Sequence, residues 1–186
     1  MAIDKITSAS ITTNAVGPTQ LNEGANYDFT GTVTGAGITG LGVADSWYLS
    51  SSWSGSANTN TLITPFTSQT AGTSSNFTHS SGTFTAPSTG VYLVLSSFAA
   101  YKGSGTFFRY IASRIYVGGS QKAMIQTMLG SEGSSNRWVQ CNCAAIVDIT
   151  NTSTDTVQFY LSPDANPIFI ENGNTSQVHF IKLAET

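Results

Sequence analysis

Short apolar segments separated by turn residues follow one another from about residue 43 onward, and this pattern predicts β-strands. The strongest signal lies at residues 81–101. There, a β-favouring run at 83–86 is ended by Pro87 and Gly90, and residues 91–101 then continue without a charge. The two faces of this second strand carry Val91, Leu93 and Leu95, and Tyr92, Val94 and Phe98. Since both faces are apolar, we expect the core to cover one face and a second sheet or another subunit to cover the other.

The remaining segments predict an all-β, antiparallel fold. Further strands are expected at residues 44–53, 106–117, 121–129, 138–149, 156–161 and 178–183. Gly118 and Gly119 permit positive φ and mark a tight hairpin, and the apolar run at 138–149 predicts a central strand. Strands at intervals of roughly 8 to 12 residues with turns between them are typical of a jelly-roll sandwich.

Three polar segments are expected to be loops, at residues 54–80, 130–136 and 162–176. Long loops in compact domains often carry function, so the first of them is a candidate contact surface. The alternative is that residues 54–80 cover the end of the barrel.

Residues 1–42 follow a different pattern. Their isolated apolar residues recur every five positions, which fits neither the helical period of 3.6 nor the strand period of 2. These residues are Ile6, Ile11, Val16 and Leu21. Such a segment is disordered, or its apolar residues meet those of neighbouring copies or insert into a larger partner. With the glycine-rich linker at 34–42, it predicts an extended N-terminal arm before a domain at residues 43–186.

Composition favours assembly over a free monomer. Charged residues make up 9% of the chain, against about 25% in a typical soluble domain. The ten Phe, seven Tyr and three Trp exclude a disordered chain. A surface so poor in charge is either covered in an assembly or kept soluble by Ser and Thr. The net charge of −3 with scattered Lys and Arg indicates no nucleic-acid partner, and the uncharged run is too short for membrane insertion.

Candidate chemistry is sparse. Cys141 and Cys143 lie two apart in a strand, where they share one face but are too close along the chain to bridge easily, so we expect buried free thiols. Their spacing to His79 and His179 matches no metal motif, and no catalytic constellation is recognisable. We therefore expect no catalytic, cofactor or metal site. The first residues lack a secretory signal, which predicts that the protein is made in the cytoplasm and either stays inside the producing cell or leaves it by lysis.

The segment GTFTAPSTGVYLVLSSF resembles the strand pair that marks the trimeric jelly rolls of the complement C-one-q globular head and tumour necrosis factor type. The matching residues are Gly82, Phe84, Ala86, Pro87, Gly90, Val91 and Tyr92. This resemblance implies a homotrimer whose central strands pack around an axis. The residues expected in trimer or core packing are Tyr92, Val94, Phe98, Phe108, Tyr110 and Phe180.

The string ITTNAVGPTQLNEG in the N-terminal arm resembles low-complexity segments of bacteriophage tail-fibre and other virion appendage proteins. The two resemblances together imply a structural virion protein, a homotrimeric knob attached to the particle through Ile6, Ile11, Val16 and Leu21. Its partners would be its own copies, other head or tail proteins and a host surface glycan. The alternatives are a bacterial lectin-like module, which would have no use for the arm, and a glycan depolymerase.

Overall fold

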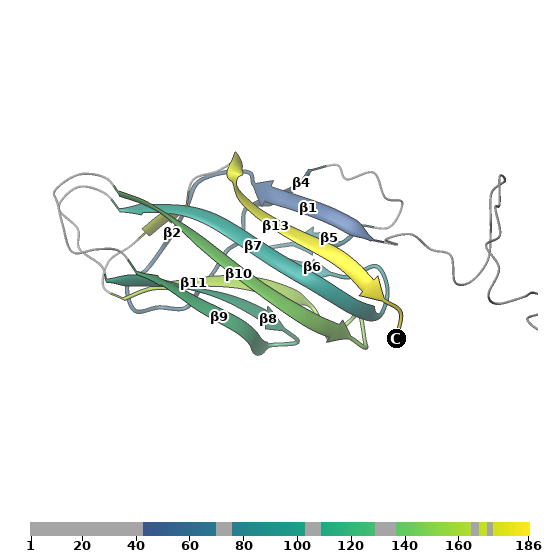
Figure 1. The fold of residues 1–186 in the computed structure, drawn as a ribbon. Coiled ribbons are helices and arrows are strands. Elements are labelled where there is room, and N and C mark those ends of the chain that lie inside the picture. Colours follow the sequence, from purple (N-terminus) through teal and green to yellow (C-terminus); the bar gives the residue numbers. More distant parts are fainter. Residues whose placement is uncertain (1–42, 70–75, 103–108, 129–136, 165–167, 171–172) are drawn as a thin grey trace, which may run out of the picture. The chain divides into compact units, whose positions relative to one another are not determined.

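Two antiparallel β-sheets packed face to face make up the described part of this computed structural model (Figure 1). The structure describes residues 43–69, 76–102, 109–128, 137–164, 168–170 and 173–186, and no helix occurs among them. The strands are β1 (Ala44–Leu49), β2 (Trp53–Gly55), β3 (Thr61–Leu62), β4 (Phe66–Gln69), β5 (Thr78–Ser80), β6 (Thr83–Thr85), β7 (Gly90–Lys102), β8 (Tyr110–Val117), β9 (Ser120–Met128), β10 (Arg137–Ile149), β11 (Val157–Pro163), β12 (Ile168–Ile170) and β13 (Gly173–Ala184). The predicted all-β, antiparallel architecture is confirmed.

Sheet A contains β4, β1, β13, β7 and β10, with β12 and β2 beside the far end of β7. In this sheet β7 pairs with β10 along its whole length on one side, and with β13 and β12 on the other. Sheet B has the order β5, β6, β11, β8 and β9, and β3 extends the pairing along β11. The strand at residues 91–101 therefore has neighbours on both sides within sheet A, and of its two apolar faces the one with Tyr92, Val94 and Phe98 is buried in the core.

Three sequence-based assignments need correction. Among the described strands β10 pairs with β7 alone, so the run expected to be central is the edge of sheet A. Residues 54–80, expected as one loop, contain the short strands β3, β4 and β5 and part of β2. Residues 162–176 contain β12 and the start of β13. β3, β4 and β5 contain Ser or Thr, whereas β12 is Ile-Phe-Ile, and all four are too short to show a clear apolar alternation. Backbone pairing to neighbouring strands forms them.

The hairpin between β8 and β9 forms where the glycine pair predicted it. Gly118 and Gly119 have φ values of 56° and 74°, which a residue without a side chain adopts at little cost. A bulge between Ile115 and Tyr116 follows at once in the register of β8 with β9. Such bulges increase the local twist of a strand pair, and this one lies next to the hairpin that ends the sheet.

The core lies between the two sheets and is built around aromatic side chains. Phe84 of β6 is fully buried and packs against Phe66, Phe159 and Phe180 with ring centroids 5.1, 5.7 and 5.1 Å away. Offset and edge-to-face contacts of this kind add to the free energy gained by burial. The core therefore joins β4 and β13 of sheet A to β6 and β11 of sheet B.

The structure places most of the residues expected in packing inside this core. Tyr92, Val94, Phe98 and Phe180 have no exposed surface. Tyr110 is half-buried at the start of β8, and Phe108 lies outside the described residues. The arm residues Ile6, Ile11, Val16 and Leu21 also lie outside the described residues.

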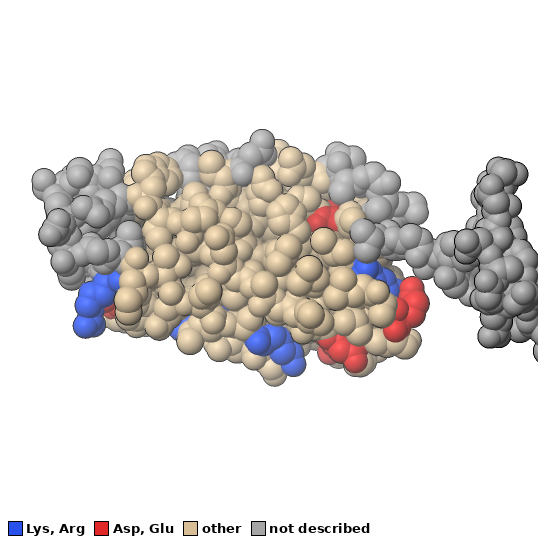
Figure 2. Space-filling model, in the orientation of Figure 1, with Lys and Arg blue, Asp and Glu red and all other residues tan. Residues whose placement is uncertain are grey.

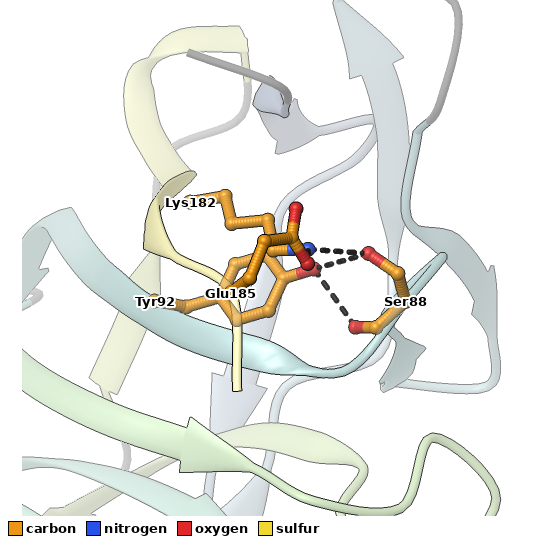
Figure 3. A network of polar contacts seen from close by, with 4 residues as sticks. All are labelled: Ser88, Tyr92, Lys182 and Glu185. Atoms are coloured by element: carbon orange, nitrogen blue, oxygen red, sulfur yellow. Dashed lines mark hydrogen bonds and ion pairs between the residues drawn. The ribbon is translucent and has the colours of Figure 1, made fainter. Parts of the chain in front are cut away.

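A buried lysine holds the end of β13 (Figure 3). Lys182 is 6% exposed, and its ammonium group donates to Ser88 Oγ at 2.9 Å and to Glu185 Oε2 at 2.6 Å. The Tyr92 hydroxyl donates to the Ser88 carbonyl at 2.9 Å, so the turn before β7 is held by both side chains. Gly90, with φ of 145°, leaves room for the lysine stem, which a Cβ there would strike. The network attaches the C-terminal end of β13 to the β6–β7 turn.

Acid is expected to weaken the fold through His79. Its ring contacts Trp47, Phe66 and Phe84, and its Nε2 accepts a hydrogen bond from the Gly82 N–H at 2.9 Å. Burial lowers the pKa of His79 below its usual 6.5. Because the pKa of His79 is lower in the folded chain than in the unfolded chain, the neutral ring contributes fully to stability above about pH 6.5. This contribution is lost as the pH falls through the pKa of the folded state.

The measurement is the urea midpoint at pH 7.5 and at pH 5.0. His79→Gln keeps a hydrogen-bond acceptor without titrating in this range, so the variant should lose less stability in acid than the parent. His179→Gln serves as the comparison, since burial also lowers the pKa of His179. An equal acid-induced loss in the parent and in His79→Gln would contradict the assignment.

Candidate assembly interface

Large apolar side chains are exposed on β9, β10 and β13. They are Met124, Ile125 and Met128 of β9, Trp138 and Ile146 of β10, and Leu183 of β13, with exposed fractions from 47% to 80%. Isolated exposed apolar residues are normal, but five of these six lie on the adjoining strands β9 and β10, and such a group marks an interaction surface.

The outer face of sheet A carries an apolar row across four strands. The register places Ala44 of β1 opposite Ile181 of β13, Ile181 opposite Leu93 of β7, and Leu93 opposite Ile146 of β10. The next row contains Ser46, His179, Leu95 and Ala144. We call these eight residues the apolar face. In a single copy this face is partly or largely open to water, although residues of its type are usually buried.

Charged side chains are scarce over this face. Figure 2 shows the surface over β13, β7 and β10 without Lys, Arg, Asp or Glu in its middle, while charged groups lie toward the ends and the lower edge of the view and one acidic group lies at the upper right, near β1. Depletion of charge with enrichment of aromatic residues and methionine distinguishes the centre of protein interfaces from ordinary surface. The apolar face has the depletion of charge, and the methionines and the tryptophan lie beside it on β9 and β10.

A hollow of about 500 Å³ lies beside the apolar face, between it and β9. Its walls include Leu95 of β7, Ile125 of β9, Ala144 of β10 and His179 of β13. The hollow is open and mostly apolar, and it has the size into which large side chains of a partner fit. The edge beside it, formed by Met124, Ile125 and Met128 of β9 and Trp138 of β10, is called the apolar edge below.

The two cysteines close the sandwich between β9 and β10. Both are buried, and neither is in a disulfide. The Cys141 thiol hydrogen-bonds to the Thr127 side chain and the Cys143 thiol to the Ile125 backbone, so both reach from sheet A to the edge strand of sheet B. Burial raises the pKa of Cys141 to about 11 and also raises the pKa of Cys143. Free thiols at the predicted position therefore have a packing role.

Native Cys141 should react slowly with thiol reagents. Because the thiolate is the reactive form, a pKa of about 11 should lower its rate at pH 8 roughly 100-fold relative to the unfolded chain. The measurement is the rate at which each thiol reacts with a chromogenic disulfide, first in buffer and then in guanidinium chloride. In guanidinium chloride both thiols should react quickly. Two thiols that react at the same rate in both conditions would show that the β9–β10 edge is open.

The described residues offer no candidate for catalysis by a metal. No group of three His, Cys, Asp or Glu side chains among them lies close enough to hold an ion. Asp155 accepts hydrogen bonds from the backbone N–H groups of Thr150 and Asn151, both at 2.9 Å, which lower its carboxyl pKa and hold the turn before β11. Asp164 accepts two bonds from Arg109, so its carboxylate is occupied as well. The described chain also contains no helix long and apolar enough to cross a bilayer.

Comparison with known proteins identifies similar folds but no related sequence. No family model and no curated protein matches the chain. Among solved structures, Eiger, a tumour necrosis factor from S. frugiperda, is similar over 77% of this chain and 94% of that chain, with 15% identity and a TM-score of 0.60. PRD1 vertex protein P5 is similar over 78% of this chain and 99% of that chain, with 17% identity and a TM-score of 0.52.

These similarities confirm the predicted jelly roll of the tumour necrosis factor type. At 15% and 17% identity they show the fold alone. The sequence pattern did not predict that Trp138 of the apolar edge and Ile146 at the outer end of the apolar row are exposed, because both were expected in a central strand. One signal could have exposed them: Ile146 alternates with buried Val147 on a strand whose outer face also carries Asn142 and Asp148.

Proposed function

We propose that the chain is a structural protein of a bacteriophage particle, in which three copies form a knob through their apolar faces and edges. The observation that carries the proposal is the unbroken apolar row Ala44, Ile181, Leu93 and Ile146, beside an apolar edge of different composition. The resemblance of residues 81–101 to trimeric jelly rolls and the similar fold of a PRD1 vertex protein support the proposal.

Two distinct patches favour a ring over a two-fold dimer. A two-fold dimer uses one patch twice and would leave either the apolar face or the apolar edge in water. A ring places the edge of each copy, with Trp138 and Met128, against the face and hollow of the next copy, so both are covered. Closure at three copies is the number implied by the resemblance.

In this proposal residues 1–42 attach the knob to the particle through Ile6, Ile11, Val16 and Leu21, and the domain at 43–186 faces outward. The knob then binds the host surface or decorates the particle, and its site of action is the virion. The partners are its own copies and neighbouring head or tail proteins.

The test is peptide mass spectrometry of particles purified on a density gradient from cells that produce the chain. The chain should band with the particles, in a copy number divisible by three. Removal of residues 1–42 should abolish banding and leave the oligomer of the domain unchanged. A full-length chain that stays in the soluble fraction would overturn the proposed role.

A further inference from the structure

The outer face of sheet B carries an aromatic pair that the assembly does not use. Tyr116 of β8 and Tyr160 of β11 lie with ring centroids 4.8 Å apart and planes inclined by 54°. Both are half-buried, because their rings lie on the outer face while Ile115, Val117, Phe159 and Leu161 point into the core. In register, Gln158 lies opposite Tyr116 and Arg114 lies opposite Tyr160. The two rings therefore form a diagonal pair on a sheet surface.

Planar polar side chains surround the two rings and are held in place. Asn60 donates from Nδ2 to the Tyr116 hydroxyl at 3.2 Å and accepts from Arg114 Nη1 at 3.2 Å. Gln158 accepts from the Tyr160 hydroxyl at 3.3 Å and donates to Thr83 Oγ1 at 3.0 Å. The three strands β6, β8 and β11 and the segment before β3 thus fix the cluster, and rigid binding groups lose little conformational entropy when a ligand binds.

The cluster has a positive charge without a carboxylate partner. In the described part of the chain Arg114 makes no ion pair, and its bond to Asn60 occupies one of its five N–H groups. Lys122 is exposed in the neighbouring β9 and has the same sign. Asp155 lies at the end of the sheet beside Gly118, but its carboxylate oxygens accept bonds from Thr150, Asn151 and Thr154. A carboxylate on a ligand would therefore meet an uncompensated guanidinium.

From this arrangement we infer that Tyr116, Tyr160, Arg114 and Asn60 form a binding site for a pyranose ring that bears a carboxylate, the chemistry of a uronic acid in a surface polysaccharide. The C–H face of the sugar would lie on the electron-rich faces of the tyrosine rings. Its carboxylate would accept from Arg114, and its hydroxyl groups would bond to Asn60 and Gln158. Charge complementarity favours this occupant over a neutral sugar.

This inference rests on the proposed function, since it supplies the receptor class for an outward-facing knob. The aromatic pair lies on β8 and β11 of sheet B, whereas the apolar face lies on sheet A. Met124 of the apolar edge lies opposite Arg114 in register, so the next copy in the ring would border the site on its β9 side. Three copies on one knob, and several knobs on one particle, would raise the apparent affinity for a repetitive polysaccharide without any new contact.

The test is isothermal titration and saturation-transfer NMR of the full chain with oligomers of galacturonate, glucuronate, mannuronate and guluronate. Methyl esters of the same oligomers remove the charge and keep the ring. The parent should bind at least one acid oligomer and bind its ester at least tenfold more weakly. Arg114→Gln and Tyr160→Ala should each weaken binding at least tenfold. Tyr110→Ala, on the same strand as Tyr116, should change it less than twofold.

Arg114→Gln keeps the size of the side chain, so it reports on the site even if Tyr160→Ala unfolds. The inference is overturned if no acid oligomer binds, if the esters bind equally well, or if Arg114→Gln binds as the parent does. Mass measured on the same samples separates the two proposals. A trimer that binds no acid oligomer removes the sugar site alone, and a monomer that binds one removes the proposed assembly but keeps the site.

Discussion

Replacing Ile146 by aspartate is expected to convert the proposed trimer into monomers. Ile146 is 69% exposed in a single copy and lies at the outer end of the apolar row, so the change should leave the fold intact. In the proposed trimer the same position would be covered by apolar groups of the next copy. A carboxylate there, without a partner, costs about 3 kcal/mol per contact, or about two orders of magnitude in affinity for each of three contacts.

Aspartate is a better probe than lysine, because the long lysine side chain can reach out of an apolar contact while its stem stays buried. The matched control is Thr78→Asp, which places the same charge on the exposed strand β5. β5 forms one edge of sheet B, and β9, which carries part of the apolar edge, forms the other. Light scattering gives the mass, and circular dichroism shows whether both variants remain folded. If Ile146→Asp and Thr78→Asp assemble equally well, the apolar row is not the interface.

The largest loss of fold stability is expected for Phe84→Ala. Phe84 is fully buried and its ring contacts Trp47 and Phe66 of sheet A and Phe159 of sheet B, so the cavity would open where the two sheets meet. Truncation of a buried phenylalanine typically costs about 3 to 5 kcal/mol, which includes both the lost burial and the cavity left behind. The surrounding strands are paired on both sides of the core and have little freedom to collapse into it.

The measurement is urea unfolding at a fixed protein concentration, since assembly adds to apparent stability. Thr85→Ala, at the next position on β6 and facing outward, is the control and should change the free energy of unfolding by less than about 1 kcal/mol. A loss below about 1 kcal/mol for Phe84→Ala would show that the β6 segment is not packed as the structure has it.

The sequence predicted the fold best where strands are long and glycine or proline marks their ends. β7, β9 and β11 begin and end within about two residues of the predicted bounds, and Gly118 and Gly119 form the predicted hairpin. In the last predicted strand Lys182 shares a face with Val178 and Phe180, and the structure buries all three. Short strands such as β3 were missed, because tertiary pairing and not local pattern forms them.

The candidate interface was less predictable, because it depends on which long strand ends a sheet. β7 and β10 are both long and rich in apolar residues, yet β7 is central and β10 is the edge. Asn142 and Asp148 on the outer face of β10 were the one local sign of this, and the pairing partners themselves lie far away in the sequence. The same limit hid the Tyr116–Tyr160 cluster, whose members come from β8, β11 and the segment before β3.

The proposed function depends on assembly into three copies, and the mass of the purified full-length chain in solution distinguishes a trimer from a monomer. Light scattering should give three times the 19.5 kDa of one chain, at concentrations down to the micromolar range and at neutral pH. A mass of 19.5 kDa under these conditions would contradict the account, because the apolar face and the apolar edge would then remain exposed to water.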